Sequence, residues 1–162
     1  MTAEPHPLDV LRAEARTTDV PTVRRQLDEL SARHAEVLES AHWGAGAEDT
    51  LRGSIGMERK MGMEMRIGLG DEWDRLPLRR TAPLADMTLP ELLAEARAGR
   101  QHLLLVLDTL LRAAEKREVR VWCLGEEVPP DLYLLGLRHR LGALAERVAG
   151  TRQDCPLNRG DA

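Results

Sequence analysis

Residues 87–107 read MTLPELLAEARAGRQHLLLVL, and they contain both the start signal and the apolar pattern of an α-helix. Thr88 and Glu91 have the T-x-x-E spacing of a capping box, and Pro90 falls in the first turn, where proline is tolerated. The apolar side chains that follow recur at helical spacing: they are Leu89, Leu92, Leu93, Ala96, Leu103, Leu107, Leu110, Leu111 and Ala114. This stretch therefore predicts a long helix with one buried face.

Three other segments show the same helical periodicity. The first begins at Asp19, which can cap the first turn, and is expected to end at His42–Gly44, where a glycine can adopt a left-handed conformation. The other two cover residues 47–69 and residues 129–150. Four amphipathic helices predict an all-α protein built as a four-helix bundle, with long crossover connections between some of the helices.

The remaining segments complete the expected organisation into one domain. Residues 1–18 form a lead-in that could include a short helix, residues 19–150 form the bundle, and residues 151–162 form a polar, flexible tail. In the connector before the last helix, residues 119–124 (VRVWCL) could be extended. One isolated strand of this length cannot form a sheet, so an ordered loop is expected there.

The composition supports an all-α fold and argues against nucleic-acid binding. Hydrophobic residues make up 43% of the 162 residues and none is Phe, so Leu, Ala, Val and Met must fill the core, which suits helix packing. The net charge is −4, from 27 acidic and 23 basic residues, whereas a nucleic-acid binder usually has a basic face. The basic pairs Arg24-Arg25 and Arg79-Arg80 sit among acids and are expected to be solvated surface.

The sequence shows no membrane or secretory signal. No apolar run approaches the ~18 residues that suggest a membrane span, and the first residues lack the basic and apolar regions of a signal peptide. Cys123 and Cys155 match no disulfide framework or metal-ligand spacing, which indicates a reducing compartment. A cytoplasmic protein is therefore expected, with Cys123 buried and inert among apolar neighbours.

Residues 47–69 are unusually rich in glycine and methionine. Each interior glycine costs about 0.5–1 kcal/mol relative to alanine, so the four present call for close approach of a neighbouring helix, a bend or a ligand cavity. Met57, Met61 and Met65 share one face and Met63 points the opposite way, so one of these faces is expected outside the core. An exposed, flexible apolar strip favours self-association, and a homodimer is predicted. The four glycines are Gly53, Gly56, Gly62 and Gly68.

The order and spacing of these helices resemble the DinB-like superfamily of bacterial four-helix-bundle proteins. Residues 51–59 (LRGSIGMER) look like that family's L-x-H-(I/L)-x-x-W-E-R segment. Residues 87–107 are similar to its L-s-P-x-E-L-L helix, and residues 131–148 to its D-L-L-x-H-x-x-x-H helix. The resemblance covers roughly residues 20–150 and implies a stress-associated bundle protein.

The resemblance also implies a metal site that this sequence has largely lost. The family binds a divalent metal with three histidines, one in its second helix and an H-x-x-x-H pair in its fourth. The matching positions are Gly53, Leu135 and His139, so His139 alone is left as a remnant ligand. A metal site normally needs three or more protein ligands, so no metal or other cofactor is predicted. His139 is then either a remnant that faces the bundle interior or an ordinary surface histidine.

Three more side chains are candidates for chemistry. Glu58 lies on the inward stripe, where a buried carboxylate could act as an acid or base; the alternative is a carboxylate at the bundle edge, paired with an arginine. His34 occupies an apolar-stripe position and His102 lies beside one. With Glu58 and His139 they could form a new set of Zn or Ni ligands; the alternative is a His34 that is partly buried and hydrogen-bonded.

Three functional interpretations follow, and they leave open whether the protein is an enzyme. The first is a DinB-like bundle with a degenerate metal triad, which serves as a stress-associated binding or structural module and could take a small-molecule ligand. The second is a metal-dependent thiol transferase of the DinB type that acts on a small molecule. The third is a helical interaction protein unrelated to that family.

Overall fold

The computed structural model describes residues 3–70, 79 and 81–153, and this part of the chain is mostly helical. The prediction of an all-α protein is therefore confirmed, apart from one small sheet. In chain order the elements are α1 (Pro7–Ala15), α2 (Val20–Leu38), α3 (Ala47–Leu69), the short 3₁₀ helix η2 (Leu84–Asp86), α4 (Leu89–Lys116), β1 (Val121–Cys123), β2 (Glu126–Val128) and α5 (Pro130–Ala149).

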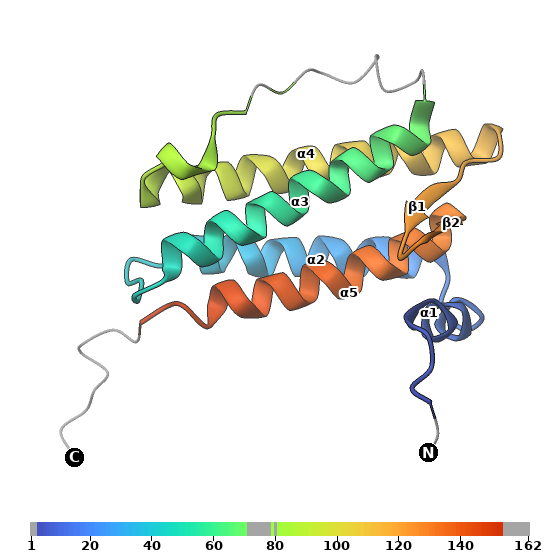
Figure 1. Ribbon diagram of the computed structural model, residues 1–162, viewed down its shortest axis with the longest axis horizontal. Coiled ribbons are helices and arrows are strands. Elements are labelled where there is room, and N and C mark those ends of the chain that lie inside the picture. The colour runs from blue at the N-terminus through green and yellow to red at the C-terminus, as the bar shows by residue number, and fades with distance from the viewer. Residues whose placement is uncertain (1–2, 71–78, 80, 154–162) are drawn as a thin grey trace.

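The four long helices pack lengthwise, with α3 along α4 and α2 along α5 (Figure 1). The short helix α1 lies across the end of α5 and contacts it. Residues 132–137 of α5 are enclosed on all sides, because each of them is buried. Aliphatic side chains and one tyrosine fill the core between the helices: among them are Leu27, Met61, Met65, Leu107, Tyr133 and Leu137.

The helix starts follow the capping signals of the sequence. The Asp19 carboxylate accepts a hydrogen bond from the backbone N–H of Thr22 at 2.8 Å, at the start of α2. The Thr88 hydroxyl oxygen accepts from the backbone N–H of Glu91 at 3.5 Å and lies 2.9 Å from its carboxylate, at the start of α4. The bounds of α3 agree with the predicted segment 47–69.

The prediction that α2 ends at residues 42–44 is wrong. Helix α2 ends at Leu38, because residues 42–44 pair with residues 151–153 and do not continue the helix. The backbone N–H of Gly44 donates to the carbonyl of Thr151 at 2.7 Å, and that of Gln153 donates to the carbonyl of His42 at 3.1 Å. Arg80, Cys155 and the tail from residue 154 lie outside the described residues.

The ordered loop expected at residues 119–124 is instead part of a β-hairpin. β1 and β2 pair antiparallel, with Val121 opposite Val128 and Cys123 opposite Glu126. Leu124 and Gly125 form the turn, and both have positive φ angles, of 52° and 86°. A two-residue turn of this kind matches the twist of a hairpin. The partner strand was missed because Glu126-Glu127-Val128 is short and acidic and carries no alternating apolar pattern.

The methionines of α3 divide between the core and the surface, but not as the sequence predicted. Met61 and Met65 are fully buried, whereas Met57 is 39% exposed and Met63 is 50% exposed. Each step of four residues turns a helix about 40° beyond one full turn, so two steps carry Met57 away from the face of Met65. None of the described helices is long and apolar enough to cross a membrane.

Gly68 allows the hairpin to approach α3, and we expect Gly68→Ala to destabilise the protein. An added Cβ would lie 2.8 Å from the carbonyl oxygen of Arg120 and 3.2 Å from a methyl group of Val121. Overpacking against backbone typically costs about 1–3 kcal/mol. Gly56→Ala is the matched control on the same helix, because a Cβ there meets nothing within 4 Å. Urea denaturation should show Gly56→Ala unchanged or stabilised by about 0.5–1 kcal/mol; equal effects of the two substitutions would contradict the contact.

Candidate functional site

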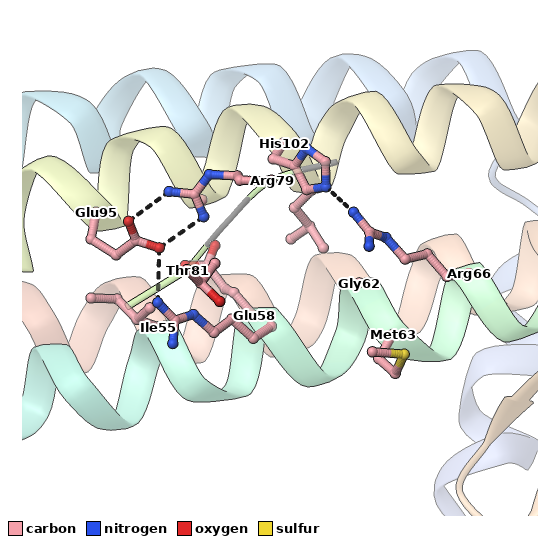
Figure 2. A pocket seen from close by; sticks show the side chains of 12 residues that line it. Ile55, Glu58, Gly62, Met63, Arg66, Arg79, Thr81, Glu95 and His102 are labelled. Carbon is pink, nitrogen blue, oxygen red and sulfur yellow. Dashed lines mark hydrogen bonds and ion pairs between the residues drawn. The ribbon is translucent and has the colours of Figure 1, made fainter. Parts of the chain in front are cut away.

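A pocket of about 270 Å³ lies between α3 and α4, and Arg79 and Thr81 line it from the connector (Figure 2). The α3 residues that line it recur every three or four positions, so they occupy one face of the helix: they are Ile55, Glu58, Arg59, Gly62, Met63 and Arg66. The α4 residues that line it are Glu95, Gly99, His102 and Leu103. The pocket thus combines charged groups with an apolar floor.

Two glycines, one on each helix, leave space for this pocket. A Cβ on Gly62 would lie 3.7 Å from a methyl group of Leu103, and a Cβ on Gly99 would lie 3.9 Å from Arg79. Both distances are ordinary van der Waals contacts, so neither glycine is required by close helix approach. Of the three reasons that the sequence suggested for its glycines, a cavity fits Gly62. Gly68 allows a close approach, but of the β-hairpin and not of a neighbouring helix.

At one end of the pocket, two arginines donate hydrogen bonds to the carboxylate of Glu95, and Figure 2 shows Arg79 beside it. Arg79 donates to both carboxylate oxygens, at 2.8 and 2.6 Å, and Arg59 donates to one of them at 3.0 Å. The two guanidinium groups outweigh the effect of burial and lower the pKa of Glu95. The prediction of solvated surface at Arg79 is therefore wrong, because its side chain is only 21% exposed and is held in the pocket by Glu95.

At the other end of the pocket, the guanidinium of Arg66 contacts the imidazole of His102. Burial lowers the pKa of His102, and the positive charges of Arg66 and Arg79 lower it further. His102 is consequently neutral at pH 7 and offers the guanidinium a lone pair.

Behind the pocket, Glu58 forms a buried ion pair with Arg100. Both side chains are only 4% exposed, and the Nε of Arg100 donates to the Glu58 carboxylate. Arg100 also donates to the hydroxyl of Ser31 on α2, at 3.3 Å. Burial raises the pKa of Glu58, and the charge of Arg100 opposes that effect. Glu58 is thus paired with an arginine, as one alternative expected, but it is buried and does not lie at the bundle edge.

His34 lies near this ion pair and is 2% exposed. Neither ring nitrogen hydrogen-bonds to any residue that the structure describes, contrary to the expectation of a hydrogen-bonded histidine. Burial, and secondarily the charge of Arg100, lower the pKa of His34 from 6.5 to about 4. His34 is therefore uncharged in the folded protein at neutral pH.

We expect stability to fall as the pH falls from 6.5 towards 4, partly because of His34. In this window the unfolded chain binds a proton at residue 34 that the folded protein excludes, so acid favours unfolding. One such group contributes a slope of up to about 1.4 kcal/mol per pH unit. Urea denaturation across this pH range should give a shallower slope for His34→Leu than for the wild type. Identical slopes would show that His34 takes up a proton in the folded protein as readily as in the unfolded chain.

The structure places the three positions implied by the family resemblance in different environments. Gly53 lies on the exposed side of α3, with nothing within 4 Å of an added Cβ, whereas Leu135 is buried in the core. The side chain of His139 is 55% exposed, and its Nε2 lies 2.8 Å from the carboxylate of Glu14 on α1. His139 therefore faces outward and pairs with a residue that the sequence did not single out.

The structure does not bring together the alternative set of ligands formed by His34, His102, His139 and Glu58. Each has a different environment: His34 lies near Arg100, His102 contacts Arg66, and His139 contacts Glu14. Among the described residues, no group of three or more His, Cys, Asp or Glu side chains could hold a metal ion.

A second polar cluster lies near Cys123, at the edge of the core, and consists of Glu64, Tyr133 and Arg140. The Tyr133 hydroxyl donates to the Glu64 carboxylate at 2.7 Å, and Arg140 contacts the same carboxylate at 3.2 Å. Burial, together with the negative charge of Glu64, raises the pKa of Tyr133 despite the nearby guanidinium of Arg140. Cys123 is buried and its thiol pKa is raised, mainly by burial, which agrees with the inert thiol expected from the sequence.

Sequence reasoning identified Glu58 and His102 but missed the arginines that partner them. One signal was present: Arg100 interrupts the apolar stripe of α4, four residues after Ala96 and three before Leu103. Comparison with known proteins adds no further assignment, since no family model, curated protein or solved structure matches this chain.

Proposed function

We propose that this protein is a binding module whose small organic ligand occupies the α3–α4 pocket. The observation that carries the proposal is the pair of glycines, Gly62 and Gly99, which leave the floor of the pocket open. Alanine would be more favourable by about 0.5–1 kcal/mol at each helix-interior position and would clash with nothing. Pockets between the helices of a bundle, with apolar walls and a few polar groups, are common ligand sites.

The test places a large side chain inside the pocket, and the control places the same side chain on the outside of α3. Gly62→Leu places a large side chain inside the pocket, whereas Gly56→Leu places the same side chain where an added Cβ meets nothing within 4 Å. A library of small organic compounds is screened against both variants and the wild type by ligand-observed NMR. We expect compounds that bind to the wild type and to Gly56→Leu but not to Gly62→Leu. A screen in which every binder also binds to Gly62→Leu would refute the pocket as the binding site.

We further propose that the four long helices form a DinB-like bundle in a stress-associated cytoplasmic protein. The support is the resemblance of residues 51–59, 87–107 and 131–148 to that family's helices. The degenerate triad of Gly53, Leu135 and His139 makes ligand binding the better proposal than a metal-dependent thiol transferase.

The protein is also proposed to form a homodimer through α3. Met57, Met63 and Ile67 are 39%, 50% and 73% exposed, and the last two lie one helical turn apart. Light scattering after size exclusion should give twice the monomer mass of 18.1 kDa. Ile67→Glu should give a monomer, and it is a cleaner test than a change at Met63, which also lines the pocket. A wild-type monomer at micromolar concentration, or a dimer that survives Ile67→Glu, would exclude this interface.

A further inference from the structure

The Glu95 carboxylate has the surroundings that a bound oxyanion would have. Arg79 holds it with two parallel hydrogen bonds, and the guanidinium of Arg59 approaches from α3. Bidentate guanidinium contacts of this kind are a common means by which proteins bind carboxylate and phosphate groups. The arrangement lies inside the pocket, because Arg59, Arg79 and Glu95 all line it (Figure 2).

The positive charge at this end of the pocket exceeds the negative charge among the described residues. Two arginines share the single carboxylate of Glu95, whereas Glu58 is matched by Arg100 behind the pocket. The guanidinium of Arg59 also donates to the carbonyl oxygen of Ala82, at 3.3 Å from each terminal nitrogen, and its Nε is buried without a hydrogen-bond partner among the described residues. The excess positive charge of Arg59 and Arg79 over Glu95 is what a second negative group would neutralise.

The rest of the pocket suits the uncharged part of such a ligand. Ile55, Gly62 and Leu103 provide an apolar floor between the two polar ends. The volume of about 270 Å³ lies just below the usual range for ligand pockets, about 300–1,000 Å³, which favours a small ligand.

We propose that the pocket binds a small organic oxyanion, a carboxylate or a phosphate monoester, with its acidic group against Arg59 and Arg79. Glu95 occupies part of the same cationic site and limits the affinity for the anion. This inference rests on the proposed function, because it names the class of ligand that the pocket takes.

The experiment compares charged and uncharged probes of nearly equal shape. Benzoate and benzamide differ in the charge of one group, and phenyl phosphate separates phosphate from carboxylate recognition. Affinities are measured by NMR titration at constant ionic strength. We expect benzoate or phenyl phosphate to bind to the wild type about tenfold more tightly than benzamide, as one charge-assisted contact allows. The tighter of the two anions identifies the acidic group.

Variants of Glu95 and Arg79 distinguish an oxyanion site from a structural ion pair. Glu95→Gln frees both arginines, so the preference for the anion over benzamide should increase. Arg79→Gln should reduce the ratio of the affinity for the anion to the affinity for benzamide towards one. Glu115→Gln, an equal change of charge at an exposed position of the same helix, should leave it unchanged. If Glu95→Gln unfolds, the wild type and Arg79→Gln still provide the comparison.

The outcomes separate this inference from the proposed function. Equal affinities for benzoate, phenyl phosphate and benzamide, unchanged in the variants, would overturn the oxyanion site, and so would a lack of binding by all three. If Gly62→Leu still abolishes binding of neutral compounds in the screen, the pocket remains a binding site for uncharged ligands. If no compound is sensitive to Gly62→Leu, the proposed function fails as well.

Discussion

Replacing Glu58 by methionine is expected to lower the free energy of unfolding by about 3–5 kcal/mol. The substitution leaves the Arg100 guanidinium buried, at 4% exposure, with the Ser31 hydroxyl as its remaining hydrogen-bond partner among the described residues. Arginine cannot lose its proton in a protein, so the charge cannot be removed by a shift in pKa. An uncompensated buried charge is among the most costly changes that a single substitution can make. Urea denaturation at pH 7 measures the loss.

Two companion variants show whether the cost arises from the unpaired charge. Arg100→Met should cost less, because the pKa of Glu58 is raised by burial and the carboxyl can take up a proton. The stability of that variant should fall as the pH rises, since the folded state favours the protonated carboxyl. The double variant Glu58→Met/Arg100→Met should recover most of the loss, because an apolar pair of similar volume replaces a buried ion pair. A loss below about 1 kcal/mol for Glu58→Met alone would mean that water reaches Arg100.

Leu107→Ala is expected to cost about 2–5 kcal/mol, the usual range for removing a fully buried leucine side chain. Leu107 is 0% exposed and belongs to the main core cluster between the helices. Leu105→Ala on the same helix is the control, because Leu105 is 39% exposed and loses less contact when truncated. The difference between the two variants is measured by denaturation under the same conditions. A loss below about 1 kcal/mol for Leu107→Ala would place this residue at the edge of the core.

The parts of the fold that could be predicted are those that depend on local signals. The bounds of α3 and the cap of α4 follow from periodicity and from Thr88, both of which can be read in a window of a few residues. The end of α2 and the hairpin could not be read this way. In both cases the deciding contact comes from elsewhere, residues 151–153 for the first and the acidic strand β2 for the second.

The site was predicted only in part, for a similar reason. Glu58 could be identified because a charged residue on an apolar stripe needs a partner, and Arg100 carries the same signal. The grouping of Arg59, Arg79 and Glu95 could not be predicted, since Arg79 lies in the connector and nothing in its own sequence places it against α4. Its basic neighbour Arg80 made a solvated surface pair the simpler interpretation.

The enclosure of α5 has a consequence for how the chain is made. Residues 132–137 are buried, and α5 contacts α1, α2, α3 and β1, all of which precede it in the sequence. During synthesis those elements therefore emerge without the helix that covers their apolar faces. The core can close only after residues 130–149 have left the ribosome, so the nascent chain carries exposed apolar surface until α5 has emerged. A chain that is truncated before α5 would be a target for chaperones and proteases.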